Sequence, residues 1–132
     1  GASIDILEVW HPDIFRFIEA KSDDNLINLA NISVGITEDF MEAVRNDEDW
    51  DLVFPDTSLP QYDEEWTGDL EEWKAKGYPV EVWETVPARE IWRKIAEHAH
   101  SDAEPGLIFL DRAEKLSNTQ NLETIRGSNP CG

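Results

Sequence analysis

The chain has 132 residues, of which 40% are hydrophobic and six are Trp, so it can build one domain with a hydrophobic core and is not disordered. Its 29 acidic residues against 11 basic ones give a formal net charge of -18 at pH 7. This charge would repel nucleic acid and anionic membranes, so we expect neither as a partner. A solvated acidic surface is the simplest explanation, with binding to a basic partner as the alternative.

The only cysteine, Cys131, cannot form an internal disulfide, which favours a reducing compartment and predicts a cytoplasmic location. No apolar run approaches the length of about 20 residues that spans a bilayer. The first residues also lack a basic region followed by an apolar one, so the sequence predicts neither a signal peptide nor a membrane anchor.

The first two predicted elements are a strand and a helix. Residues Ile4 to Trp10 are rich in Ile, Leu and Val, which favours a buried strand. His11-Pro12-Asp13 then supplies a proline and an acid for a first helical turn. The following apolar residues recur at helical spacing and predict an amphipathic helix; they are Ile14, Phe17 and Ile18.

A second strand and helix follow. The β-branched residues from Ile32 to Ile36 predict a strand, and Thr37 is a typical N-cap for a helix after it. Glu38 and Asp39 favour the positive end of that helix. Its buried stripe is predicted to consist of Phe40, Met41 and Val44.

The middle of the chain is interpreted as two antiparallel strands, Trp50 to Phe54 and Val80 to Val86, joined by an acidic insert from Pro55 to Pro79. This connection is too long for a simple turn. Within it, Asp69 to Lys76 predicts a short helix that ends where Gly77 adopts a left-handed conformation.

The strongest predicted helix opens with Pro87-Ala88-Arg89-Glu90 and runs to about Ser101. Its apolar face is formed by Ile91, Trp92, Ile95 and Ala99. Pro105-Gly106 then breaks the chain before Leu107 to Leu110, a continuous apolar run typical of a fully buried strand. From Asp111 onward the sequence is polar and predicts irregular structure.

Three histidines and two acidic clusters are the candidates for a metal site. His98 and His100 are too close to share a helix face, so we interpret them and His11 as surface residues. Asp47-Glu48-Asp49 and Asp63-Glu64-Glu65 do not follow the calcium-loop pattern and are interpreted as solvated loops. The sequence therefore predicts no metal site.

Three of the Trp residues lie in or near the acidic insert, at Trp66, Trp73 and Trp83. A carbohydrate-binding platform is one reading of such a group. Packing of the insert onto the body of the protein explains the same residues more simply, and we expect packing.

Four sequence segments together resemble a known family. They are His11-Pro12-Asp13-Ile14 with Phe17 to Lys21, Asn31 to Val34 with Thr37 and Phe40 to Val44, Ala88 to Trp92 with Lys94-Ile95, and Glu104 to Arg112 leading to Asn129-Pro130-Cys131-Gly132. They are similar to the large, catalytic subunit of ribonucleotide reductases, most closely the adenosylcobalamin-dependent class. The segment from Asp51 to Pro79 resembles a subgroup of the cobalamin-dependent enzymes.

The resemblance implies an α/β fold. Residues 1–132 would be an internal slice of a ten-stranded α/β barrel, with the acidic, helix-containing insert at 55–79. The alternating strands and helices predicted above agree with such a slice. A slice should expose apolar strand edges and self-associate, so a homo-oligomer is one expectation.

The resemblance also implies the chemistry. Cys131 would be the residue whose thiyl radical starts nucleotide reduction, on a finger loop through the barrel, and Asn129 would hydrogen-bond the substrate ribose. Adenosylcobalamin would generate the initial radical, and the partners would be a ribonucleotide and the other segments of the reductase. The isolated chain is expected to be inactive and to bind no cofactor. The alternative is a non-catalytic, acidic protein-interaction module derived from the reductase.

Overall fold

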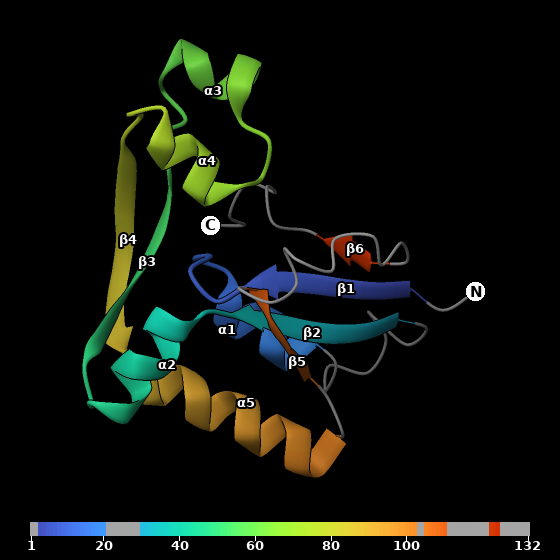
Figure 1. Cartoon of the computed structure of the whole chain (residues 1–132). Helices are drawn as coiled ribbons and strands as arrows, with labels where there is room; N and C mark the ends of the chain where they lie inside the picture. Colours follow the sequence, from blue (N-terminus) through green and yellow to red (C-terminus); the bar gives the residue numbers. More distant parts are fainter. Residues whose placement is uncertain (1–2, 21–29, 103–104, 111–121, 125–132) are drawn as a thin grey trace.

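Two sheets organise the chain (Figure 1). The computed structural model describes residues 3–20, 30–102, 105–110 and 122–124. Within them, one sheet has four parallel strands in the order β5-β2-β1-β6, and the other is an antiparallel ribbon of β3 and β4. In chain order the elements are β1 Ser3–Glu8, α1 Ile14–Glu19, β2 Ala30–Ile36, α2 Glu38–Arg45, β3 Asp49–Pro55, α3 Pro60–Glu65, α4 Leu70–Ala75, β4 Val80–Pro87, α5 Ala88–Asp102, β5 Gly106–Phe109 and β6 Leu122–Thr124. The predicted α/β class is confirmed, although the described residues form no closed barrel.

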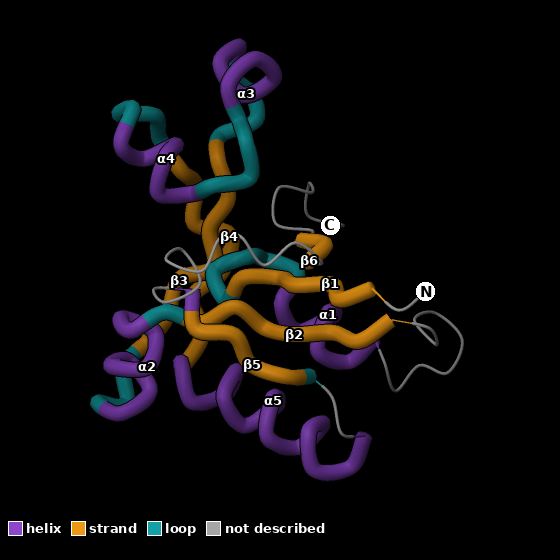
Figure 2. The backbone as a smooth tube through the Cα atoms, turned by 45° about the vertical axis from the view of Figure 1, so that its right-hand side comes forward, coloured by secondary structure: helices purple, strands orange, loops and turns teal. Residues whose placement is uncertain are grey.

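The parallel sheet is built around the crossover from β1 through α1 to β2. Alternate residues of β2, Ile32, Val34 and Ile36, have no exposed surface, as a strand covered by helices requires. They pack in one core with apolar side chains of α1 and α5. Figure 2 shows α1 and α5 on the same side of this sheet. The core contains Leu7, Val9, Ile14, Phe17, Ile18, Ile32, Val34, Ile36, Phe40, Ala43, Leu52, Val86, Ala88, Ile91 and Ile95.

The cap predicted for α2 is confirmed. The Thr37 hydroxyl oxygen accepts a hydrogen bond from the backbone N–H of Phe40, and Thr37 itself has extended backbone angles. Phe40 has no exposed surface. Its ring packs edge-on against the ring of Trp50, with the two ring centroids 5.1 Å apart. Met41 and Val44 are partly buried against the same core, so the predicted stripe is correct.

The strands β3 and β4 form the predicted antiparallel pair, and the insert at their far end holds two helices. The helix α4 begins after Asp69, whose carboxylate accepts from the Glu72 N–H, and ends before Gly77 at φ 84°, as predicted. The sequence reading missed α3, a helix of six residues that starts at Pro60 and carries no fully buried side chain. We call residues 49–87 the arm; its tip, formed by α3 and α4, projects away from the parallel sheet (Figures 1 and 2).

The insert has its own aromatic packing. Trp73 is 1% exposed, and Trp66 packs with Trp10 and Phe54, so the expectation of packing is confirmed for these two Trp residues. It is wrong for Trp83, which is 49% exposed. The reason is that β4 pairs with β3 alone among the described strands, and nothing described there covers it.

The helix α5 spans the range predicted, with Ile91 and Ile95 buried, but Ala99 is exposed. The fully buried strand expected at Leu107 to Leu110 is wrong. On β5 the side chains of Leu107 and Phe109 are 38% and 42% exposed, because β5 is at the edge of the described sheet and is bordered only by β2.

The strand β6 was not predicted, since the sequence after Asp111 reads as irregular. Leu122, Glu123 and Thr124 pair in parallel with Ile4, Asp5 and Ile6 of β1. Three residues are too few for a periodic pattern, so only the partner strand defines this element.

Candidate functional site

The carboxyl ends of four parallel strands meet at one edge of the sheet. These ends are Glu8 of β1, Ile36 of β2, Phe109 of β5 and Thr124 of β6. In α/β proteins, ligands bind outside the carboxyl ends of the strands. This edge is therefore the expected position of functional side chains.

A buried polar turn follows β1 at this edge. Glu8 and His11 are 6% and 1% exposed, and they are the buried polar side chains among the described residues. The indole Nε1 of Trp10 donates to Oε1 of Glu8 at 2.8 Å. The backbone N–H of Asp13 donates to Nδ1 of His11 at 3.0 Å. The sequence reading did not single out Glu8, although an acid within an apolar, buried strand is a signal that could have found it.

His11 is a core residue, so its interpretation as a surface histidine is wrong. The centroid of its ring lies 5.5 Å from the ring centroid of Phe54 and 5.6 Å from that of Trp10. Because Nδ1 accepts a hydrogen bond, this geometry assigns the ring proton to Nε2. The turn is closed by two backbone hydrogen bonds, from the His11 N–H to the Glu8 carbonyl and from the Ile14 N–H to the His11 carbonyl.

The other metal candidates do not come together. His98 is partly exposed and His100 is exposed on α5. In the described part of the chain, no group of three or more His, Cys, Asp or Glu side chains could hold a metal ion. Within those same ranges, no helix is long and apolar enough to cross a bilayer.

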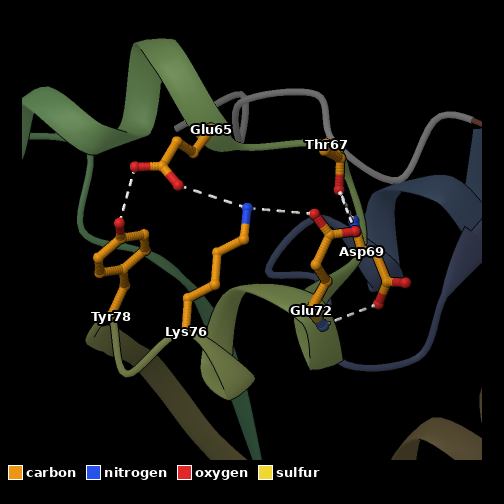
Figure 3. A network of polar contacts seen from close by, with 6 residues as sticks. All are labelled: Glu65, Thr67, Asp69, Glu72, Lys76 and Tyr78. Carbon is orange, nitrogen blue, oxygen red and sulfur yellow. Dashed lines mark hydrogen bonds and ion pairs between the residues drawn. The ribbon is translucent and has the colours of Figure 1, made fainter.

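The acids of the insert hold its two helices together (Figure 3). The Tyr78 hydroxyl donates to Oε2 of Glu65 at 2.7 Å. Nζ of Lys76 lies 3.4 Å from Oε1 of Glu65 and 3.3 Å from Oε1 of Glu72. These contacts connect the end of α3 to α4, so this group of residues is a structural network.

Protonation in this network follows its contacts. The hydrogen bond from Tyr78 is the main cause that lowers the pKa of Glu65, and the same bond raises the pKa of Tyr78. Desolvation acts to lower the pKa of Lys76, but its contacts with Glu72 and Glu65 outweigh that effect and raise it. The contacts thus favour the charged forms of Glu65 and Lys76 and the neutral phenol of Tyr78, which is the pattern of a structural network.

The predicted site residues Asn129 and Cys131 lie outside the described residues. In the sequence they follow Thr124, the last residue of β6, by five and seven positions. Thr124 is paired with Ile6 of β1, two residues before Glu8. The strand that leads to the Asn-Pro-Cys-Gly motif therefore ends at the same sheet edge as the buried turn.

A comparison with protein families matches residues 1–132 to the family described as "Ribonucleotide reductase, barrel domain". The chain belongs to this family. The ribonucleotide reductase resemblance of the four sequence segments is thereby confirmed at the level of the large-subunit barrel domain.

Curated relatives agree with this family. A protein of Thermoplasma acidophilum described as "Vitamin B12-dependent ribonucleoside-diphosphate reductase" is 36% identical over 133 residues, which cover 100% of this chain and 14% of the relative. A Mycobacterium tuberculosis protein with the same description is 30% identical over 133 residues, covering 100% of the chain and 16% of that relative. A "Ribonucleoside-diphosphate reductase large subunit" of Caenorhabditis elegans is 34% identical over 137 residues, covering 99% and 17%. The chain thus spans about one sixth of the length of these relatives. Two of them are described as vitamin B12-dependent, and the third is described only as a large subunit.

Proposed function

We propose that this chain is the part of an adenosylcobalamin-dependent ribonucleotide reductase that carries the radical cysteine, Cys131, and a substrate-binding amide, Asn129. The match of residues 1–132 to the reductase barrel domain carries this proposal. The two relatives described as vitamin B12-dependent support the cofactor class. A cytoplasmic location belongs to the same proposal, because a chain with one cysteine suits a reducing compartment.

The proposed chemistry is a reversible hydrogen-atom exchange at Cys131. The thiyl radical takes the hydrogen atom from the 3′ carbon of a ribonucleotide, so that an S–H bond forms, a C–H bond breaks and the unpaired electron moves to carbon. After reduction, the same hydrogen atom returns to the 3′ carbon and restores the thiyl radical. The two electrons for reduction come from a dithiol outside this segment, which becomes a disulfide as the 2′ C–O bond breaks and the hydroxyl leaves as water. A thiol suits this role because S–H and activated C–H bonds are similar in strength.

Asn129 and the fold contribute positioning. The amide of Asn129 would hydrogen-bond the ribose, while Pro130 restricts and Gly132 permits the backbone conformations of the loop. The parallel pairing of β6 with β1 supports the assignment. The strand β6 precedes this loop in the sequence, and its carboxyl end lies at the edge of the sheet where ligands bind in α/β proteins. When bound, adenosylcobalamin would supply the initial radical through its carbon–cobalt bond.

The test is Cys131→Ser in the full-length large subunit that contains this segment. We expect reduction of ribonucleotides to be lost while nucleotide binding is retained, since an O–H bond is too strong for reversible exchange. Hydrogen exchange at the 5′ carbon of adenosylcobalamin should disappear as well. Asn129→Ala should be milder, costing about 1–3 kcal/mol of ribose binding.

A matched control is Glu71→Gln, an exposed residue on α4 of the insert. We propose that the insert is peripheral to catalysis, so this variant should keep its turnover. Exchange at the wild-type rate in Cys131→Ser would remove Cys131 from the radical role. Reduction without adenosylcobalamin would refute the cofactor assignment and leave the role of Cys131 standing.

A further inference from the structure

The outer strand of the arm exposes two large apolar side chains. Val82 is 56% exposed and Trp83 is 49% exposed, and both are on β4. All residues from Glu81 to Thr85 are exposed, so neither face of this stretch is covered by any described residue. Large exposed apolar side chains on an uncovered strand are a candidate contact surface, and the charge around them decides what could bind.

Trp83 also lies at an irregularity of the ribbon. Leu52 of β3 pairs with Glu84, but the next residue, Val53, pairs with Val82, so Trp83 is the extra residue on β4. A bulge of this kind bends the strand and interrupts its ladder. A regular strand from another molecule therefore cannot pair along the whole of β4. The interrupted ladder therefore favours binding through side chains at this place.

The charge of the arm limits what can bind. Residues 49–87 contain eleven acidic and two basic residues, a net charge of -9, which is half of the formal charge of -18 for the whole chain. Glu81 and Glu84 flank Trp83 and share one face of the ribbon, because they pair with Phe54 and Leu52, whereas Val82 pairs with Val53 and lies on the other face. A second copy of the arm or an anionic bilayer would be repelled, whereas a cationic partner would be attracted.

Arginine is the side chain that fits both the exposed indole of Trp83 and the negative charge around it. Its guanidinium group stacks on an indole face and pairs with carboxylates at the same time. We propose that Trp83, Glu81 and Glu84 form a docking surface for an arginine-bearing segment of a partner protein. The arm projects from the parallel sheet, and β3 and β4 cross along its length, with β4 the outer strand near the tip (Figure 1).

The experiment uses the full-length large subunit and a short synthetic peptide that alternates Arg and Ala. Its controls are the same peptide with citrulline in place of Arg, which keeps the shape and removes the charge, and a version with Lys. We expect the Arg peptide to bind more tightly than the Lys peptide, the citrulline peptide to bind least, and the affinity of the Arg peptide to fall with added salt.

The variants locate the surface. Trp83→Thr should weaken binding of the Arg peptide about three- to tenfold, and Trp83→Phe should weaken it less. The double change Glu81→Gln with Glu84→Gln should reduce the salt dependence. Leu107→Thr, which removes an exposed apolar side chain on β5, should leave binding unchanged.

Three results would overturn the proposal. The first is equal binding of the Arg and citrulline peptides, or no effect of Trp83→Thr. The second is a fluorescence quencher failing to reach Trp83 in the full-length subunit, which would mean that the subunit itself covers the surface. The third is self-association that Trp83→Thr abolishes, which would make a second copy the occupant.

Discussion

At the scale of single residues, the turn after β1 shows how a polar cluster can belong to a core. Glu8, Trp10 and His11 are all buried, yet each has a hydrogen-bonding group that needs a partner. The indole of Trp10 donates to Glu8, and the imidazole of His11 accepts from the backbone of Asp13. These hydrogen bonds fix the conformation of the turn at the sheet edge where β6 also ends.

A pair of substitutions at Glu8 tests this role. Glu8→Leu removes the acceptor of the Trp10 indole N–H and should lower the free energy of unfolding by about 1–3 kcal/mol. Glu8→Gln keeps an oxygen in the same place and should cost less. Urea unfolding of the 132-residue chain at low concentration measures both. Equal losses in the two variants would show that this hydrogen bond does not stabilise the turn.

At the scale of elements, the arm is an extension with its own small core. Buried side chains from β3 and α4 meet Trp10 of the turn, and Tyr62, Trp66 and Val80 pack around them. The Trp73 indole N–H donates to the carbonyl of Pro79 at 2.8 Å, which ties α4 to the start of β4. The insert is therefore attached to the body through aromatic packing at its base.

Two Trp residues of the same arm give a matched comparison. Trp73→Ala removes a side chain that is 1% exposed and should cost about 3–5 kcal/mol of stability. Trp83→Ala removes one that is 49% exposed and should change stability by less than about 1 kcal/mol. Thermal unfolding followed by circular dichroism measures both. A large loss for Trp83→Ala would mean that β4 is covered in solution.

At the scale of the whole molecule, the described sheet has open sides. Leu107 and Phe109 are exposed on β5, and β5 and β6 are the edges of the described parallel sheet. The chain also spans only 14% to 17% of the length of its relatives. The rest of a large subunit would have to cover these surfaces in the proposed enzyme.

The 132-residue chain on its own should therefore self-associate. We expect its mass by sedimentation to rise with concentration, because exposed strand edges and apolar side chains pair with one another. Leu107→Lys combined with Phe109→Lys should shift the chain towards the monomer. A wild-type chain that is a stable monomer would favour the alternative of a self-contained acidic interaction module.

The sequence by itself determined the features that depend on neighbours within one turn of chain. The cap at Thr37, the end of α4 at Gly77 and the apolar spacing of α1 are examples, since their contacts span a few residues. The sequence also determined the reductase family, because the motifs that resemble the family are short runs of residues that can be recognised without a structure. The roles of Asn129 and Cys131 come from those motifs and stay predictions.

Only the tertiary structure decided which residues the core encloses and which strands find partners. His11 and Glu8 are polar but buried because Phe54 and Trp10 close over the turn, and a contact between His11 and Phe54 is invisible to local periodicity. Phe109 and Trp83 are apolar but exposed because β5 and β4 are edge strands in the described sheets. The strand β6 exists only through its pairing with β1, more than a hundred residues earlier in the sequence. Burial and strand pairing are long-range properties, so local sequence patterns do not determine them.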